Sequence, residues 1–181
     1  LDSKTPKKPF SVALALTDKI DTLVGFFGID QKPTSSKDPY ALRRAALGVI
    51  KLSIDNNKEF KIKDLINYSI SLHKDQGFEL LNNILQKELT DFLIERLKYY
   101  MKEKEIRIDI IEASINSNGV DNINKIYRKA SILNGLINKQ IGEDIVSSYK
   151  RASNILESEL KNNSLELLNT VDSGILKKVR I

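Results

Sequence analysis

A chain of 181 residues, 41% of them hydrophobic, is long enough to bury one sizeable core or two small ones. It contains no cysteine, which excludes disulfides and thiolate metal sites such as zinc ribbons and is consistent with a reducing compartment. The 29 basic against 24 acidic residues give a net charge of +5, a mild excess that permits a polyanionic partner without requiring one.

A first helix is expected from about Ser11 to Phe27, after an N-terminal stretch that contains lysine and proline. Apolar residues at helical spacing form its buried face: Leu16, Ile20, Leu23, Val24 and Phe27. On the other side Asp18, Lys19 and Asp21 interrupt the apolar run, so the segment lacks the continuous apolar core of a signal peptide or a spanning helix. We therefore expect neither secretion nor insertion into a membrane.

The clearest helix start in the sequence is Asp38 followed by Pro39. Aspartate accepts hydrogen bonds from the first N–H groups of a helix, and proline already has a helical φ, so a helix is predicted to begin at Pro39. Turn-forming Gly, Pro, Thr and Ser residues between positions 28 and 36 predict a polar loop before it.

This second helix has one apolar stripe, made of Leu42, Ala45, Ala46, Val49 and Ile50. These positions follow the i, i+3, i+4, i+7, i+8 spacing of a buried helix face. Arg44 points away from the stripe and Arg43 lies at its edge. The stripe therefore predicts core packing, and the two arginines are available for binding.

The rest of the chain is also helical in its periodicity, and no run of β-branched residues alternates over the length of a strand. Further helices are expected over residues 62–72, 77–86, 87–102, 106–115, 120–137 and 142–159, with a weak one at 165–171. Polar residues from Asn116 to Gly119 mark the first credible boundary, which divides the chain into residues 1–115 and 116–181. We predict an all-α protein that is at least half helix.

No motif for nucleotide binding or catalysis occurs in the sequence. A Walker loop, a dinucleotide fingerprint, a metalloprotease helix and a nucleophile elbow are all missing. The single histidine, His73, is accompanied by no Ser, Cys or Asp motif, so it is interpreted as a helix-terminal or partly buried residue and not as a catalyst. We expect no catalytic residue, metal or cofactor in this chain.

Residues 14–52, LALTDKIDTLVGFFGIDQKPTSSKDPYALRRAALGVIKL, resemble a stretch of the β subunit of the bacterial tetrameric glycyl-tRNA synthetase. The resemblance is specific because helical periodicity alone would not generate this irregular string of Gly, Pro and charged residues. It continues more weakly from Asp91 to Glu103 and returns in YKRASNIL, Tyr149 to Leu156. One departure is Asp30, which stands where the family usually has glycine. Since aspartate tolerates a left-handed backbone better than most residues, the turn is expected to survive.

The resemblance implies that the chain corresponds to part of the C-terminal half of a synthetase β subunit. Residues 1–115 would be the C-terminal part of an HD-like helical domain, and residues 116–181 connecting helices that lead towards a helical anticodon-binding domain. The implied partners are glycine tRNA and the synthetase α subunit. The implied location is the cytoplasm. ATP would be used by the whole enzyme through motifs in the α subunit, so this chain alone is expected to be inactive.

The role implied by the resemblance is to bind and position glycine tRNA. A surface with that role needs basic side chains that neutralise phosphates, with few contacts to bases. Lys32, Lys37, Arg43 and Arg44 are the first candidates, since the loop and the helix start bring them together. Lys150 and Arg151, in the YKRASNIL segment, are the second.

Two alternatives stay open. The same DPYALRR segment could serve only to pack domains or subunits of the synthetase, with Arg43 and Arg44 bridging acidic side chains. The segment ALTDKIDTL also resembles the helix that carries the last aspartate ligand of HD-type phosphohydrolases, which would be Asp18. Those enzymes need histidines from earlier helices, and none precedes Asp18, so no functional metal is expected there.

Overall fold

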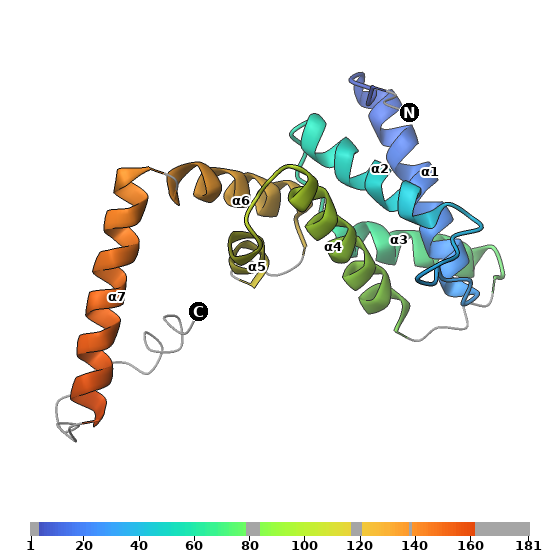
Figure 1. Cartoon of the computed structure of the whole chain (residues 1–181). Coiled ribbons are helices and arrows are strands. Elements are labelled where there is room, and N and C mark those ends of the chain that lie inside the picture. The colour runs from blue at the N-terminus through green and yellow to red at the C-terminus, as the bar shows by residue number, and fades with distance from the viewer. Residues whose placement is uncertain (1–3, 79–83, 117–120, 138, 162–181) are drawn as a thin grey trace. The chain divides into compact units, whose positions relative to one another are not determined.

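The computed structural model describes residues 4–78, 84–116, 121–137 and 139–161. Over these residues every regular element is a helix and no strand is present, which confirms the all-α prediction (Figure 1). The helices are α1 (Pro9–Gly28), α2 (Leu42–Asp55), α3 (Ile62–Asp75), α4 (Leu85–Glu103), α5 (Ile108–Asn116), α6 (Ile123–Ile137) and α7 (Gln140–Lys161). None of the helices in the described part is long and apolar enough to cross a membrane.

Helix α1 is the centre of the first compact unit, because it packs against α2, α3 and α4. It begins at Pro9, a residue suited to the first helical position, and not at Ser11. Its buried residues are Val12, Leu16, Ile20, Leu23, Val24, Phe27 and Gly28, which include the whole predicted stripe. At its end Phe27 meets Phe92 of α4, with ring centroids 5.1 Å apart. The apolar residues that repeat at helical spacing in the sequence thus form one face of α1, and three neighbouring helices cover that face.

Helix α2 begins at Leu42, three residues later than the predicted start at Pro39. The N-cap residue is Ala41, with a left-handed φ of +55°, and not the predicted Asp38. The Asp38 carboxylate still accepts the first bonds: the backbone N–H of Leu42 donates to Oδ1 at 2.8 Å and that of Arg43 to Oδ2 at 3.0 Å. Pro39 lies in a turn instead, closed by a bond from the Ala41 N–H to the Asp38 carbonyl at 3.2 Å. The predicted helix start at Pro39 was wrong because proline's fixed φ suits a turn position as well as a first helical position.

The helix predicted over residues 87–102 is confirmed, since these residues lie within α4, but the one predicted over 77–86 is wrong where the structure describes it. Gly77 has a left-handed φ of +83°, and its N–H and that of Phe78 donate to the carbonyls of Lys74 and His73. This is the C-terminal closure of α3, so Gly77 ends one helix and does not begin another. Helix α4 then runs without interruption through the predicted break at Gln86. Residues 79–83, and the weak helix predicted at 165–171, lie outside the described residues.

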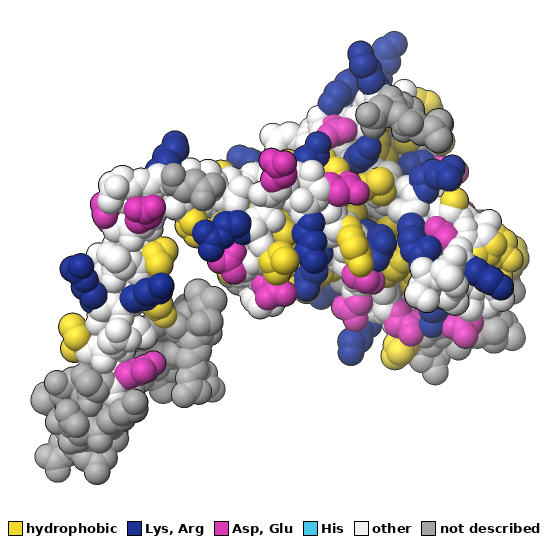
Figure 2. All heavy atoms as spheres, in the orientation of Figure 1, with side chains coloured by type: hydrophobic (Ala, Val, Ile, Leu, Met, Phe, Trp, Pro, Cys, Tyr) yellow, Lys and Arg dark blue, Asp and Glu magenta, His cyan; other side chains and the backbone are white. Residues whose placement is uncertain are grey.

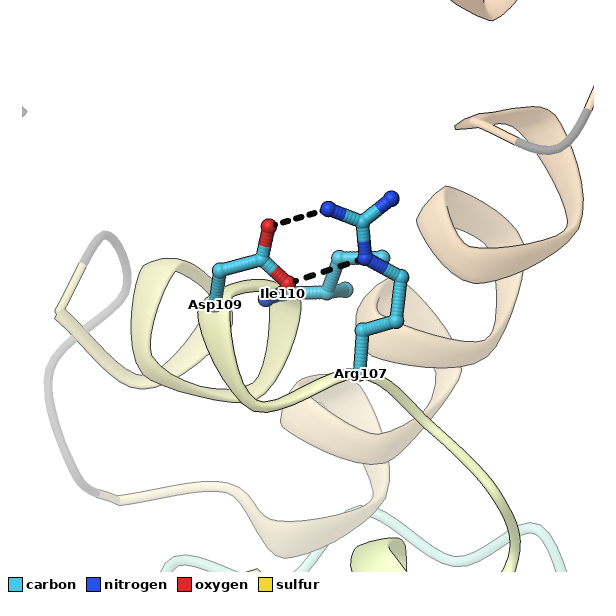
Figure 3. A network of polar contacts seen from close by, with 3 residues as sticks. All are labelled: Arg107, Asp109 and Ile110. Carbon is cyan, nitrogen blue, oxygen red and sulfur yellow. Dashed lines mark hydrogen bonds and ion pairs between the residues drawn. The ribbon is translucent and has the colours of Figure 1, made fainter.

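Helix α5 starts at Ile108, where the sequence predicted Ile106, and an ion pair closes its first turn. Arg107 donates to both carboxylate oxygens of Asp109, Nε to Oδ1 at 3.2 Å and a terminal nitrogen to Oδ2 at 2.7 Å (Figure 3). The Ile110 N–H also donates to Oδ1, at 3.0 Å. The hydrogen bonds from Arg107 are the main reason why the pKa of Asp109 lies below its ordinary value. A negative charge is favourable at this end of a helix.

The chain divides into two compact units within α6, between Ser131 and Ile132. The start of α6 belongs to the first unit, because the N–H of Ile62 and that of Lys63 donate to the carbonyl and carboxylate of Asp121, both at 3.0 Å. The Asn124 amide also donates to Asn57 Oδ1 at 2.9 Å. The units therefore divide later than the boundary predicted at 116–119. The interpretation of residues 1–115 as an HD-like domain, and of 116–181 as connecting helices, stays a prediction.

Replacing Asp38 by alanine should lower the free energy of unfolding by about 1–2 kcal/mol, because two N–H groups at the start of α2 lose their acceptor. Asp38→Asn retains one acceptor oxygen, so its free energy of unfolding should lie between those of the parent and of Asp38→Ala. Urea unfolding followed by circular dichroism measures all three. An Asp38→Ala variant as stable as the parent would show that these two bonds do not hold the helix start.

Candidate nucleic-acid interface

Lys32, in the loop between α1 and α2, is paired with two carboxylates. Its Nζ lies 2.7 Å from Asp30 Oδ1 and 2.7 Å from Glu88 Oε2 on α4. These hydrogen bonds, first to Asp30 and then to Glu88, raise the pKa of Lys32 above its ordinary value. The ammonium thus ties the loop to α4, and its charge is already matched by anions of the chain itself.

Asp30, at the departure from the family pattern, has a left-handed backbone with φ of +60°. The turn expected at this position is therefore kept with aspartate in place of glycine. The aspartate also supplies one of the two carboxylates that hold Lys32, which a glycine would not do.

Arg43 is half-buried and points back into the same loop. Its guanidinium donates to the carbonyl of Thr34, while its own backbone N–H is held by Asp38. Thr34 and Lys37 close the loop through a bond from the Thr34 N–H to the Lys37 carbonyl, at 2.9 Å. Arg43 therefore fixes the shape of the loop, and Lys37 is exposed on it.

Arg44 is exposed and lines a groove of about 650 Å³ between α1, α2 and the segment before α1. Three lysines line the same groove, Lys4, Lys19 and Lys51, together with one acidic residue, Asp18. We call it the α1–α2 groove. No hydrogen bond or ion pair joins the Arg44 side chain to another residue within the described ranges. Of the first four candidates, Arg44 is thus the one whose charge faces an open hollow.

Lys150 and Arg151 are exposed on α7, in the second unit. Their exposure agrees with a solvated helix face as well as with a binding face. The two units are separate bodies, so the structure relates only Lys32, Lys37, Arg43 and Arg44 to one another.

Sequence reasoning does not select Lys19 and Lys51 as site residues. The sequence pattern places Lys19 on a solvated helix face together with Asp18. In the structure, Lys19 Nζ does lie 3.6 Å from Asp18 Oδ2. The signal that could select the two lysines is Gly48 in the middle of α2. It lies four residues after Arg44 and three before Lys51, so these three positions share one face of the helix. A small residue on such a face often marks a close approach of another element.

His73 does not face Asp18. Its Nε2 lies 3.0 Å from Oδ1 of Asp21, its ring packs edge-on against Phe78, and it borders Gly25 of α1. It is half-buried and contacts α1 near the end of α3, as expected of a helix-terminal or partly buried histidine. Among the residues described, no three histidine or acidic side chains are placed to hold a metal ion. The expectation that Asp18 binds no metal stays a prediction.

Figure 2 shows basic and acidic side chains interspersed over this face of the molecule, with dark-blue ones standing out at the N-terminal end of α1. The lysines there, Lys4, Lys7 and Lys8, are all exposed. In this view the basic side chains do not form one large basic face. The α1–α2 groove is one place where several of them meet. Local charge of this kind suits a few phosphate contacts.

Comparison with known proteins gives a consistent result. The sequence model of the family described as glycyl-tRNA synthetase beta subunit matches residues 1–116. The glycine–tRNA ligase beta subunit of Ruegeria sp. (strain TM1040) is 40% identical over 161 residues, which are 89% of this chain and 22% of that protein. The one from Rhodospirillum centenum is 37% identical over 176 residues, 97% of this chain and 24% of the relative. The chain thus spans at most 24% of the length of these two relatives.

Replacing Lys32 by methionine should lower the stability of the first unit by at most about 1 kcal/mol at neutral pH, because exposed ion pairs are screened by water. A raised pKa stabilises the fold below the unfolded-state value and stops doing so as pH rises through the folded-state value. The difference between the two proteins should therefore persist at neutral pH and shrink only above about pH 10.5, the ordinary lysine value.

Thermal melts across this pH range measure the effect, with Lys63→Met as a matched control for an exposed lysine on α3. If the control loses as much stability as Lys32→Met, the two ion pairs are not the cause.

Proposed function

Because the chain belongs to the glycyl-tRNA synthetase β-subunit family, we propose that its first unit helps to bind glycine tRNA and to position it for the synthetase α subunit. The whole enzyme would use ATP to attach glycine to the tRNA, and this chain would contribute no catalytic residue. The relatives carry the name of a ligase subunit, which is consistent with this division of work. A cytoplasmic location belongs to the proposal, since tRNA is charged where it is used.

The observation that carries the proposal is the exposure of Arg44 in a groove lined by three lysines and one aspartate. RNA phosphates are recognised mostly by Lys and Arg side chains, and arginine donates two parallel hydrogen bonds to a phosphate. Asp38 fixes the start of α2, and buried Leu42, Ala46 and Val49 fix its orientation, so Arg44 is held by a rigid element. Lys37 adds an exposed cation in the adjoining loop. Lys150 and Arg151 remain a second proposed contact.

A structural role is the second candidate, and it is favoured for two of the residues. The guanidinium of Arg43 is bound to the Thr34 carbonyl, and the Lys32 ammonium lies between Asp30 and Glu88. We therefore propose that Arg43 and Lys32 shape the loop that presents Lys37, and that Arg44 and Lys37 contact RNA. The arginine pair of the DPYALRR segment would then divide into one structural and one binding residue.

The test is glycylation of tRNA by reconstituted α and β subunits, the β subunit being a full-length chain that contains this segment. Arg44→Ala combined with Lys37→Ala should reduce charging and flatten the salt dependence of tRNA binding by about one unit of slope for each phosphate that is no longer neutralised. The melting temperature should stay nearly unchanged, because both side chains are exposed. Arg43→Ala should instead lower the melting temperature, since it removes the bond to the Thr34 carbonyl.

Arg128→Ala is the matched control, an exposed arginine on α6 that lies in the same unit. Unchanged charging by the Arg44 and Lys37 double variant would contradict a tRNA role for this surface. A collapse of its melting temperature would favour the purely structural module.

A further inference from the structure

The α1–α2 groove is large enough for a small molecule. Its volume of about 650 Å³ lies within the range of small-ligand sites, roughly 300–1,000 Å³. Small residues line it, namely Ala15 on α1 and Ala41, Ala45 and Gly48 at and within α2. The short alanine side chains on both helices leave room for the hollow, whereas the space over Gly48 is taken by Lys19.

The segment before α1 closes one side of the groove. Lys4, Thr5 and Pro6 line it, and the Thr5 hydroxyl donates to Oδ2 of Asp55 at 2.6 Å, at the end of α2. The side chain of Lys7 donates to the Asp55 carbonyl as well. This segment is therefore fastened to the end of α2 by two bonds, and it provides a third wall of the groove.

Gly48 allows a lysine of α1 to reach across to α2. A Cβ atom added to Gly48 would lie 2.5 Å from Cε and 2.6 Å from Cδ of Lys19. The aliphatic part of Lys19 thus rests directly on the backbone of α2, in a space that only glycine leaves. Because Arg44 lies one turn before Gly48, the Lys19 ammonium and the Arg44 guanidinium belong to the same hollow.

The side chains that line the groove carry more positive than negative charge. Asp18 is the one acidic lining residue, and it lies 3.6 Å from the Lys19 ammonium. Even without Lys51, the cations Lys4, Lys19 and Arg44 outnumber the one lining carboxylate, so the groove favours an anion. One carboxylate without histidine is a poor site for a metal ion, which makes a bare cation an unsuitable occupant.

We infer that the α1–α2 groove binds one nucleotide, with its phosphate between Lys19 and Arg44 and its sugar and base against the alanines and Leu47. The nucleotide could be a unit of an RNA strand or a free mononucleotide, since both present the same phosphate. The inference goes beyond tRNA positioning, because it assigns a bounded site to residues of α1 that the sequence did not select. It also holds whether or not Lys37 contacts tRNA.

The test is equilibrium titration of the full chain with three probes: adenosine 5′-monophosphate, a single-stranded RNA tetranucleotide and inorganic phosphate. Lys19→Ala should weaken binding of a nucleotide by roughly threefold to tenfold, the effect of one partly exposed charged contact. Gly48→Ala should weaken it comparably without removing a charge, because the new methyl group displaces the end of the Lys19 side chain.

Gly48→Ala has a matched control in Gly135→Ala, also within a helix, where an added Cβ meets nothing within 4 Å. Lys63→Ala controls for loss of one exposed positive charge. Melting temperatures are measured for all variants. Gly48→Ala should melt no lower than the parent, since alanine favours helix and a flexible lysine end moves easily. If Lys19→Ala does not fold, the nucleotide affinity of Gly48→Ala alone tests the site.

Binding of the mononucleotide would identify a free nucleotide as sufficient, and binding of the tetranucleotide alone would identify RNA as the source; either result supports the site. The inference is overturned if neither binds more tightly than inorganic phosphate. It is also overturned if Gly48→Ala binds like the parent, or if Gly135→Ala or Lys63→Ala loses as much affinity. Lys19-dependent nucleotide binding alongside normal charging by the Lys37 and Arg44 double variant would instead reject only the proposed tRNA role.

Discussion

Helix α1 buries one face against α2, α3 and α4 at once, and the position of the candidate site follows from that packing. Leu23 and Val24 are fully buried at the centre of this face. Because a helix has 3.6 residues per turn, burying that face directs Asp18, Lys19 and Thr22 towards the edge of α2. The groove is therefore a consequence of how two helices cross, and the segment before α1 closes one side of it.

Positive charge serves two different purposes in the first unit. In the loop before α2, the side chains of Lys32 and Arg43 are bound by Asp30, Glu88 and the Thr34 carbonyl, so they shape the chain. In the groove, the lining holds four cations and one carboxylate. A net charge of only +5 is thus compatible with a site of locally strong positive charge, because most of the acidic residues lie elsewhere.

The errors in predicted helix ends have a common physical cause. Pro39 and Gly77 both occur at helix ends and in turns, and which role each takes depends on the contacts around it. Pro39 lies in a turn, in which Tyr40 stacks on Phe26 with centroids 4.1 Å apart. Gly77 closes α3 by hydrogen bonds to carbonyls of its last turn. That the Asp38 carboxylate accepts bonds at the start of α2 was predictable from local bonding, whereas the choice between two roles of Pro39 or Gly77 was not.

The sequence by itself determined the all-α class, the buried face of α1, most of that of α2, Asp38 as an acceptor at the start of α2, and the synthetase family. Each of these depends on spacing along one helix or on a local string of residues. Ala45 of the predicted α2 stripe is only half-buried and lines the groove. Only the tertiary structure decided that Lys32 pairs with Glu88, that Arg43 turns into the loop while Arg44 faces a groove, and that Lys19 rests on Gly48. Lys32 and Glu88, like Lys19 and Gly48, lie far apart in the chain, whereas Arg43 and Arg44 are adjacent residues on different sides of one helix. Their partners are therefore set by where the helices cross, which periodicity does not specify.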